Sequence, residues 1–313
     1  MATSRRLAAR LLPALGSLIL LAAVFAWLDR DALRAALVAP SPGWLAAALL
    51  LGVPQIALSA WRWQLTAHRL DAPLPFGRAL AEYYLGSFLN QVLPGGVLGD
   101  ASRAWRHART QAADSPGPRA AWLAVVLERA SGQFALLLLA LATLLFSPVI
   151  GQVLGRAFAG IDQDSSAAPL PVRLALTGAA LVLLLFVLRR NGLLRHLANA
   201  GQRALLARDA LWRQLLASLA ITASYLAVYF CCARMLGINT PATTLLALIP
   251  WVLLAMALPL SLAGWGLREG AAALLWAAAG LDVAQGVAIS ISYGLVVLLS
   301  TLPGAWVLAR RAP

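Results

Sequence analysis

Lysine is missing from this chain, and all 25 of its basic residues are arginine. A Walker A motif needs a lysine to hold the phosphates of ATP, and a Schiff base forms on a lysine amine. The absence therefore excludes P-loop binding of ATP and covalent catalysis by lysine within this chain.

Cysteine is almost as scarce. The only two cysteines, Cys231 and Cys232, are adjacent inside an apolar run. This spacing offers neither a disulfide framework nor a set of metal ligands. We interpret both as small core residues and expect no metal and no cofactor.

Charged residues are also few, at 12% of the chain, whereas 61% of its residues are hydrophobic. A water-soluble core cannot bury that much apolar surface, so we expect the lipid bilayer to be the solvent. Stretches of about 20 apolar residues can cross a bilayer as helices. The sequence predicts six such spans, at 11–28, 43–61, 120–148, 172–188, 212–236 and 284–308.

Two more apolar segments, at 79–98 and 243–281, are interrupted by proline and glycine. The first contains Leu93-Pro94-Gly95-Gly96, and the second contains Leu258-Pro259 and Gly264-Trp265-Gly266. Broken helices are tolerated at membrane depth only where protein or a water-filled cavity surrounds them. We predict two re-entrant helical hairpins, the second of which could instead be two short crossing helices. The fold class is then an all-α membrane bundle of about eight segments in one domain, 1–313.

The orientation follows from the arginines of the connecting segments. With a cytoplasmic N-terminus, most of them fall on the cytoplasmic side, Arg62 among them, so both termini are predicted to be cytoplasmic. This bias accounts for the net charge of +13, although a dedicated anionic partner remains an alternative. His68, His107 and His196 lie in the same arginine-rich connections, where we interpret them as solvated residues without a metal role.

The two broken segments share a pattern. Pro94, Gly99 and Arg103 are spaced like Pro259, Gly264 and Arg268, 165 residues later. Each half of the chain, about 1–150 and 165–313, holds three predicted full spans. Because three is an odd number, the second half is expected to be inverted in the membrane relative to the first. Inverted repeats of this kind recur in transporters, where broken helices from the two halves form the substrate site. Chance is the alternative, since leucine, proline and glycine are common here.

Ionic residues also fall within the predicted spans. Glu128 and Arg129 lie near mid-depth of the third span, where a charge costs about 2.5–3.5 kcal/mol on insertion scales. Both must therefore face a cavity or find partners, for which Asp100, Arg103, Arg268 and Glu269 are available. A structural charge network, or an Arg103 that reaches the interface from a helix end capped by Asp100, remains an alternative. The predicted substrate path comprises Asn90, Gln91, Pro94, Gly95, Gly96, Gly99, Asp100, Arg103, Glu128, Arg129, Pro259, Gly264, Gly266, Arg268 and Glu269.

These motifs together resemble those of the lysylphosphatidylglycerol synthase transmembrane-domain family, which is often described as flippase-like. The resemblance rests on Ser59-Ala60-Trp61-Arg62-Trp63, on the run from Glu82 to Gln91, on Leu93-Pro94-Gly95-Gly96 with Gly99-Asp100 and Arg103, on Glu128-Arg129 with Gly132, and on Gly264-Trp265-Gly266 with Arg268-Glu269. It covers nearly the whole chain. The family pattern usually has two glycines before the aspartate, and here Leu98 replaces one of them.

The resemblance implies a protein of the bacterial inner membrane that moves a phospholipid or lipid-linked molecule between leaflets. Its partners would be membrane lipids and not nucleic acid. Aminoacyl transfer is not expected, since family members that make the lysyl lipid carry a soluble synthase domain after the membrane part. Two alternatives stay open: a membrane transferase that uses Asp100, Glu128 or Glu269, and a non-catalytic partner in envelope assembly.

Overall fold

The protein is helical throughout the part that its computed structural model describes, which is residues 40–93, 96–111, 117–158, 170–178, 201–202, 205, 208–256 and 264–310. A short helix covers 170–178. The other helices are α3 (Pro42–Arg69), α4 (Phe76–Val92), α5 (Leu98–Ala108), α6 (Gly117–Phe146), α7 (Pro148–Phe158), α10 (Arg208–Met235), α11 (Ala242–Met256), α12 (Leu267–Ala279), α13 (Val283–Thr301) and α14 (Pro303–Ala309).

Four of these helices are long and apolar enough to cross a membrane. They are α3, α6, most of α10 and α13. The all-α membrane architecture expected from the sequence is therefore confirmed. The predicted span at 11–28, and the part of the predicted span at 172–188 that follows residue 178, lie outside the described residues, so the total number of membrane segments stays a prediction.

Each of the two interrupted segments is divided between two helices. Between α4 and α5 the chain becomes extended at Leu93, and Gly96 has a positive φ of 58°. Before α12 the backbone turns at Gly264 and Gly266, whose φ angles are 83° and 87°, a region that favours glycine. Pro94, Gly95 and Pro259 lie outside the described residues.

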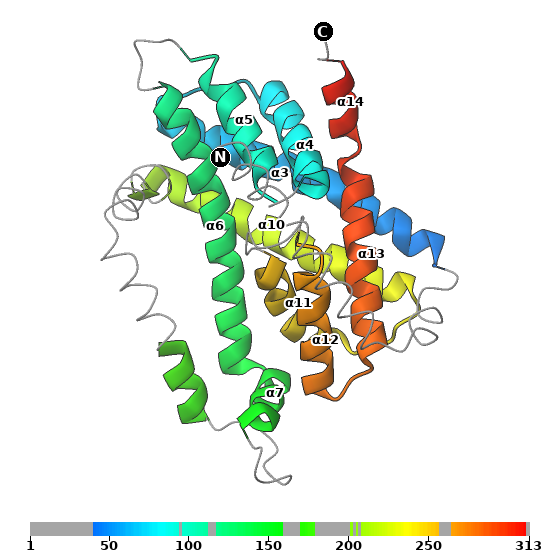
Figure 1. Ribbon diagram of the computed structural model, residues 1–313. Coiled ribbons are helices and arrows are strands. Elements are labelled where there is room, and N and C mark those ends of the chain that lie inside the picture. Colours follow the sequence, from blue (N-terminus) through cyan, green and yellow to red (C-terminus); the bar gives the residue numbers. More distant parts are fainter. Residues whose placement is uncertain are drawn as a thin grey trace, which may run out of the picture.

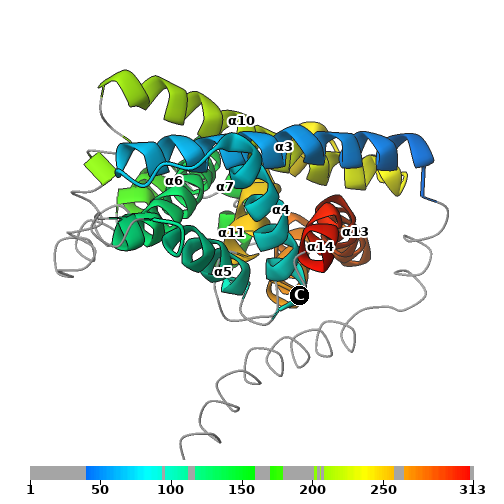
Figure 2. The same ribbon diagram turned by 90° about the horizontal axis from the view of Figure 1, so that it is seen from above.

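The helices α3 and α10 run antiparallel side by side (Figures 1 and 2). At one end, the backbone N–H of Ser41 donates to the carbonyl oxygen of Met235 at 2.8 Å. Further along, Gln214 Nε2 donates to Thr66 Oγ1 at 3.1 Å. The pair forms one wall of the bundle, against which α4, α6, α11 and α13 pack.

α6 and α13 cross this wall in opposite directions (Figure 1). α6 leads from the end where α5 lies to the end where α7 lies, while α13 leads from the end of α12 back to α14. α4, α5 and α14 gather at one end of the molecule and α7 and α12 at the other. The interior enclosed between them is lined from both halves of the chain.

Two buried tryptophans mark two apolar cores. Trp63 is fully buried among small residues, including Ala60, Ala104 and Ala124. Trp276 is fully buried in the larger core of α10 to α13. Small side chains let helices approach closely, as they commonly do in membrane bundles. The polar side chains described next lie beside these cores.

Candidate functional site

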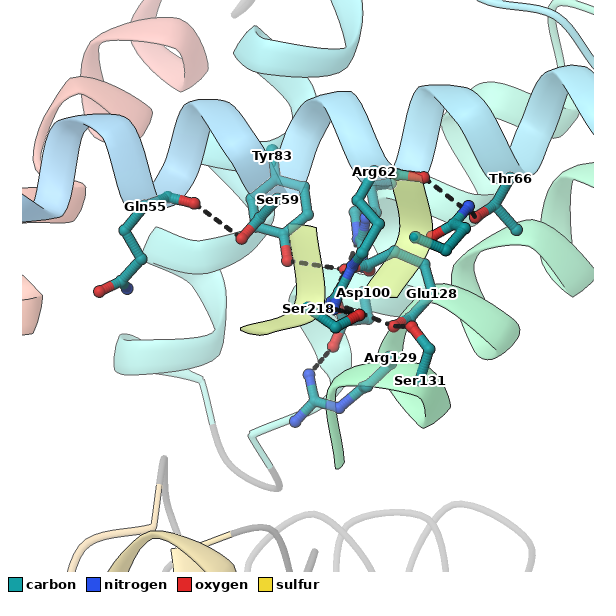
Figure 3. A network of polar contacts seen from close by, with 12 residues as sticks. Gln55, Ser59, Arg62, Thr66, Tyr83, Asp100, Glu128, Arg129, Ser131 and Ser218 are labelled. Carbon is teal, nitrogen blue, oxygen red and sulfur yellow. Dashed lines mark hydrogen bonds and ion pairs between the residues drawn. The ribbon is translucent and has the colours of Figure 1, made fainter. Parts of the chain in front are cut away.

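Five ionic side chains from three helices meet inside the bundle. Figure 3 labels four of them, Arg62, Asp100, Glu128 and Arg129. α3 contributes Arg62, α5 contributes Asp100 and Arg103, and α6 contributes Glu128 and Arg129. We call these five residues the ionic cluster. All of them line one cavity of about 200 Å³.

Glu128 is the centre of the ionic cluster. Its side chain is 1% exposed, and each of its oxygens accepts a hydrogen bond from a buried guanidinium group. Oε1 lies 2.7 Å from Arg62 Nη2, and Oε2 lies 2.7 Å from Arg103 Nη2. The hydroxyl of Tyr83 also donates to Oε1, at 3.2 Å. One carboxylate thus holds α3, α4 and α5 against α6.

Asp100 is the second acceptor of the cluster. Its Oδ1 accepts from Arg103 Nε at 2.9 Å. Its Oδ2 accepts from Asn90 Nδ2 at 3.1 Å and from Arg129 Nη1. Asn90 also accepts, through Oδ1, from the backbone N–H of Gly99 at 2.8 Å. Asn90 therefore links the end of α4 to the first turn of α5 and also contacts the ionic cluster.

Aromatic faces hold Arg103 in place. Its guanidinium carbon lies 4.8 Å from the centre of the Trp63 ring and 4.5 Å from that of Tyr83. Cations are attracted to such faces, most strongly where water is excluded. Arg103 is 2% exposed, so other side chains of the bundle enclose its guanidinium group, whereas the alternative of an interfacial arginine expected it to extend outward.

Glycines let α4 and α5 approach closely enough to build this arrangement. A Cβ added at Gly99 would overlap the carbonyl oxygen of Gly86. Gly132, on the cavity side of α6, would place a Cβ 3.0 Å from Arg62 Nη2. Larger residues at these positions would displace the helices or the guanidinium group.

Polar and apolar side chains from both halves of the chain line the cavity. The ionic cluster lines it together with Ser87, Asn90 and Gln91 of α4. The second half contributes the apolar residues Val228, Leu253, Met256 and Val297, and also Tyr225, Tyr293, Ser300 and Thr301. Such a lining suits a ligand with a charged part and an apolar part.

The ionic cluster carries more positive than negative groups. Three guanidinium groups, those of Arg62, Arg103 and Arg129, share two carboxylates. The cluster thus has one positive charge in excess. Arg129 differs from the other two arginines in its exposure, which is 36% for its side chain against 3% and 2%.

A second buried ionic group lies apart from the cavity. Arg268 Nη2 is 2.7 Å from Glu269 Oε1, which also accepts from Ser290 Oγ at 3.1 Å, and all three residues are fully buried. Glu269 Oε2 accepts from the backbone N–H of Gly266 at 2.7 Å. Arg268 contacts the cavity only through residues of its wall, one of them being Met256, whose Sδ lies 3.9 Å from Nη1.

The predicted path residues therefore fall into two groups. Those that line the cavity are Asn90, Gln91, Gly96, Asp100, Arg103, Glu128 and Arg129. Gly99 supports them through its contacts with Asn90 and Gly86. Gly264, Gly266, Arg268 and Glu269 belong to the second group. For each of these predicted path residues, a role in a substrate path stays a prediction.

Arg62 was not predicted as a site residue, and its assignment to a cytoplasmic connection is wrong. α3 continues to Arg69, eight residues beyond the predicted end of the span, and encloses Arg62 within the bundle. A signal was present in the sequence: Gln55, Ser59, Arg62 and Thr66 recur at helical spacing and form a polar stripe on one face.

His107 is also not the solvated residue that we expected. It is 1% exposed, and its ring packs edge-on against Trp63 with 5.5 Å between ring centres. The reason is its position one turn after Arg103, on the buried face of α5. Burial lowers the pKa of His107 below its ordinary value. His68 is exposed as expected, and His196 lies outside the described residues.

Comparison with known proteins adds one match. A family model described as the lysylphosphatidylglycerol synthase TM region matches residues 13–304. The match includes every residue of the ionic cluster and of the second ionic group. None of the curated proteins compared with the chain matches it.

Proposed function

The chain belongs to the lysylphosphatidylglycerol synthase TM region family of membrane proteins involved in lipid handling, and from this premise we propose that it is a lipid flippase or transporter. The ligand would be a phospholipid or lipid-linked molecule whose headgroup crosses the membrane through the cavity. Movement would be facilitated or coupled to an ion, since the chain lacks the lysine of an ATP-binding loop.

The observation that carries this proposal is the charged cavity within an apolar bundle. Charges inside a membrane are costly, and they mark substrate or ion pathways when they face a cavity. Here five ionic side chains line a space of about 200 Å³. A lipid headgroup needs a polar surrounding while its acyl chains stay in the bilayer, and a cavity lined by both ionic and apolar side chains suits such a ligand.

An internal repeat supports a transporter architecture. α3, α4 and α6 begin at residues 42, 76 and 117, and α10, α11 and α13 begin at 208, 242 and 283, each 166 residues later. The corresponding helices α3 and α10 run in opposite directions, as do α6 and α13 (Figure 1). We propose that 1–150 and 165–313 are inverted repeats within one membrane domain, with hairpins that enter from opposite faces.

The proposed location is the bacterial inner membrane, with both termini in the cytoplasm. The excess of arginine on one side of the proposed topology supports it. In this orientation the α3–α4 connection faces the cytoplasm and the α10–α11 connection faces outward.

A transferase is less well supported by the same geometry. Both oxygens of Glu128 pair with guanidinium groups, and both oxygens of Asp100 do as well. Such pairing favours the ionised carboxylates and suits them to balance charge.

The proposal is tested by reconstituting the protein in liposomes and measuring transfer of labelled anionic, zwitterionic and aminoacylated lipids between leaflets. We expect faster transfer of at least one of them. Ser87→Trp, which fills the cavity without a change of charge, should abolish the acceleration. Leu216→Trp, on a 63% exposed position of α10, should leave it intact.

Failure to accelerate any lipid would refute a flippase. A product missing from the lipid profile of cells that lack the protein would instead favour a transferase. Capture of a stoichiometric envelope protein, without lipid transfer, would favour an assembly partner.

A further inference from the structure

Arg129 is the accessible arginine of the ionic cluster. Its side chain is 36% exposed and lines the cavity, whereas those of Arg62 and Arg103 are nearly fully buried. Arg62 and Arg103 are each committed to Glu128 at 2.7 Å. A ligand that enters the cavity can therefore reach the guanidinium group of Arg129 without breaking the centre of the cluster.

Asp100 can lose Arg129 without being left unpaired. It keeps Arg103 Nε at 2.9 Å and Asn90 Nδ2 at 3.1 Å. The only other hydrogen bond that the structure gives Arg129 is to the carbonyl oxygen of Gly96, at 3.4 Å, which is long for a hydrogen bond. Replacing a protein carboxylate by a bound anion therefore costs less free energy at Arg129 than at Arg62 or Arg103.

The charges that remain after such an exchange are balanced. Arg62 and Arg103 carry two positive charges, and Asp100 and Glu128 carry two negative charges. Arg129 then presents one positive charge to the cavity. A ligand with one negative charge is neutralised, while each further negative charge would enter the bundle without a partner and at a high cost.

We infer that Arg129 binds the headgroup phosphate by exchanging Asp100 for it, and that the site selects a lipid phosphodiester over a phosphomonoester or a diphosphate. The inference rests on the proposed function and names its substrate class. A phosphodiester has one negative charge shared by two oxygens, and the planar guanidinium fork can donate to both. A lipid-linked diphosphate carries additional charge that the cluster cannot balance.

The test is a comparison of binding by the purified full chain in detergent. The probes are a short-chain diacyl phosphodiester lipid, the matching phosphatidic acid, a short polyprenyl diphosphate, a soluble glycerophosphodiester and inorganic phosphate, measured by isothermal titration. We expect the lipid phosphodiester to bind about 10- to 100-fold more tightly than the other probes, because the monoester and the diphosphate bring an unpaired charge into the bundle, and the soluble diester and inorganic phosphate lack acyl chains.

Two variants assign the binding of the phosphate to Arg129. Arg129→Gln should reduce binding of the phosphodiester lipid by about 10-fold or more, since no unpaired positive charge then faces the cavity. Arg129→Lys, which keeps the charge without the fork, should bind with intermediate affinity. The control is Arg109→Gln, at an exposed arginine that directly follows α5 and packs over Trp105 outside the cavity. Thermal unfolding of each variant identifies any that fails to fold.

The outcomes separate this inference from the proposed function. Binding of no lipid by the wild type contradicts both. Binding of the diphosphate as tightly as the phosphodiester, or unchanged binding by folded Arg129→Gln, overturns this inference alone. Equal binding of the soluble and the lipid phosphodiester would show a phosphate site that does not recognise lipid.

Discussion

At the scale of single residues, Glu128 is expected to contribute most to the stability of the ionic cluster, because it pairs with two buried guanidinium groups. Removing one partner of a buried ion pair leaves an uncompensated charge. The substitution Glu128→Gln keeps the shape of the side chain and removes its charge. We expect it to lower the free energy of unfolding by about 3–5 kcal/mol, measured by denaturation in detergent.

The control for this substitution is Asp282→Asn. Asp282 is exposed and caps α13 through the backbone N–H of Ala284 at 2.9 Å, a hydrogen bond that asparagine can also accept. We expect a change within about 0.5 kcal/mol. Equal losses for the two variants would show that Glu128 has no special place in the bundle.

The buried His107 predicts a pH dependence of stability. Because burial lowers its pKa in the folded protein, the unfolded chain binds the proton more readily. The free energy of unfolding should therefore fall as the pH decreases from about 6.5, the ordinary value for histidine. His107→Phe, which can keep the edge-on contact with Trp63, should reduce this fall, whereas His68→Gln should not. Identical pH profiles for the wild type and His107→Phe would contradict this account.

Most of the residues that carry charge inside the bundle could be predicted from sequence, with Arg62 as the exception, but their pairing could not. Glu128 and Arg129 stand out because an apolar run surrounds them. The pairing of Glu128 with Arg62 joins residues 66 positions apart, and no local pattern specifies it. Arg268 and Glu269 instead pair with each other, behind the wall of the cavity.

At the scale of helices, the contact between α4 and α5 depends on two glycines. Gly99 faces the backbone of Gly86 so closely that no Cβ fits between them. Gly99→Ala should lower the free energy of unfolding by about 1–3 kcal/mol, the usual cost of overpacking. It should also weaken lipid transfer, because Asp100 follows Gly99 directly.

Gly77 on α4 is a matched control, since a Cβ there meets no atom within 4 Å. Gly77→Ala should leave the stability unchanged or raise it by up to about 1 kcal/mol, because alanine favours helix. Thermal unfolding of the two variants, measured side by side, tests whether only the Gly99 substitution lowers the stability. A Gly99→Ala protein as stable as the wild type would show that the helices can separate at no cost.

Most helices could be predicted from hydropathy, and the differences lie where polar residues are buried. The predicted span at 120–148 corresponds to α6, and that at 212–236 to α10. The predicted end at residue 61 is too early because Arg62 and Thr66 lower the local hydropathy although both are buried. Hydropathy measures affinity for lipid, whereas these side chains face other helices.

At the scale of the whole molecule, the proposed topology places the end of α5 and the end of α10 on opposite sides of the membrane. Thr110 follows α5 and Asn239 follows α10, and both are exposed. In a background with Cys231 and Cys232 replaced by alanine, we expect Asn239→Cys to react with a membrane-impermeant thiol reagent in intact cells. Thr110→Cys should react only after the cells are opened.

Labelling of both positions from the same side would contradict the inverted repeat and the orientation together. Labelling of Thr110→Cys alone in intact cells would reverse the orientation and leave the repeat intact. The inverted repeat stays a proposal, which rests on the spacing of Pro94, Gly99 and Arg103 and on the offset of 166 residues that three pairs of helix starts share.

The most direct test of a charged cavity that receives a lipid headgroup is a structure determined in lipid nanodiscs that contain an anionic phospholipid. We predict a headgroup phosphate within hydrogen-bond distance of Arg129, with Glu128 still paired to Arg62 and Arg103. A cavity filled by acyl chains, with every headgroup at the membrane surface, would contradict it.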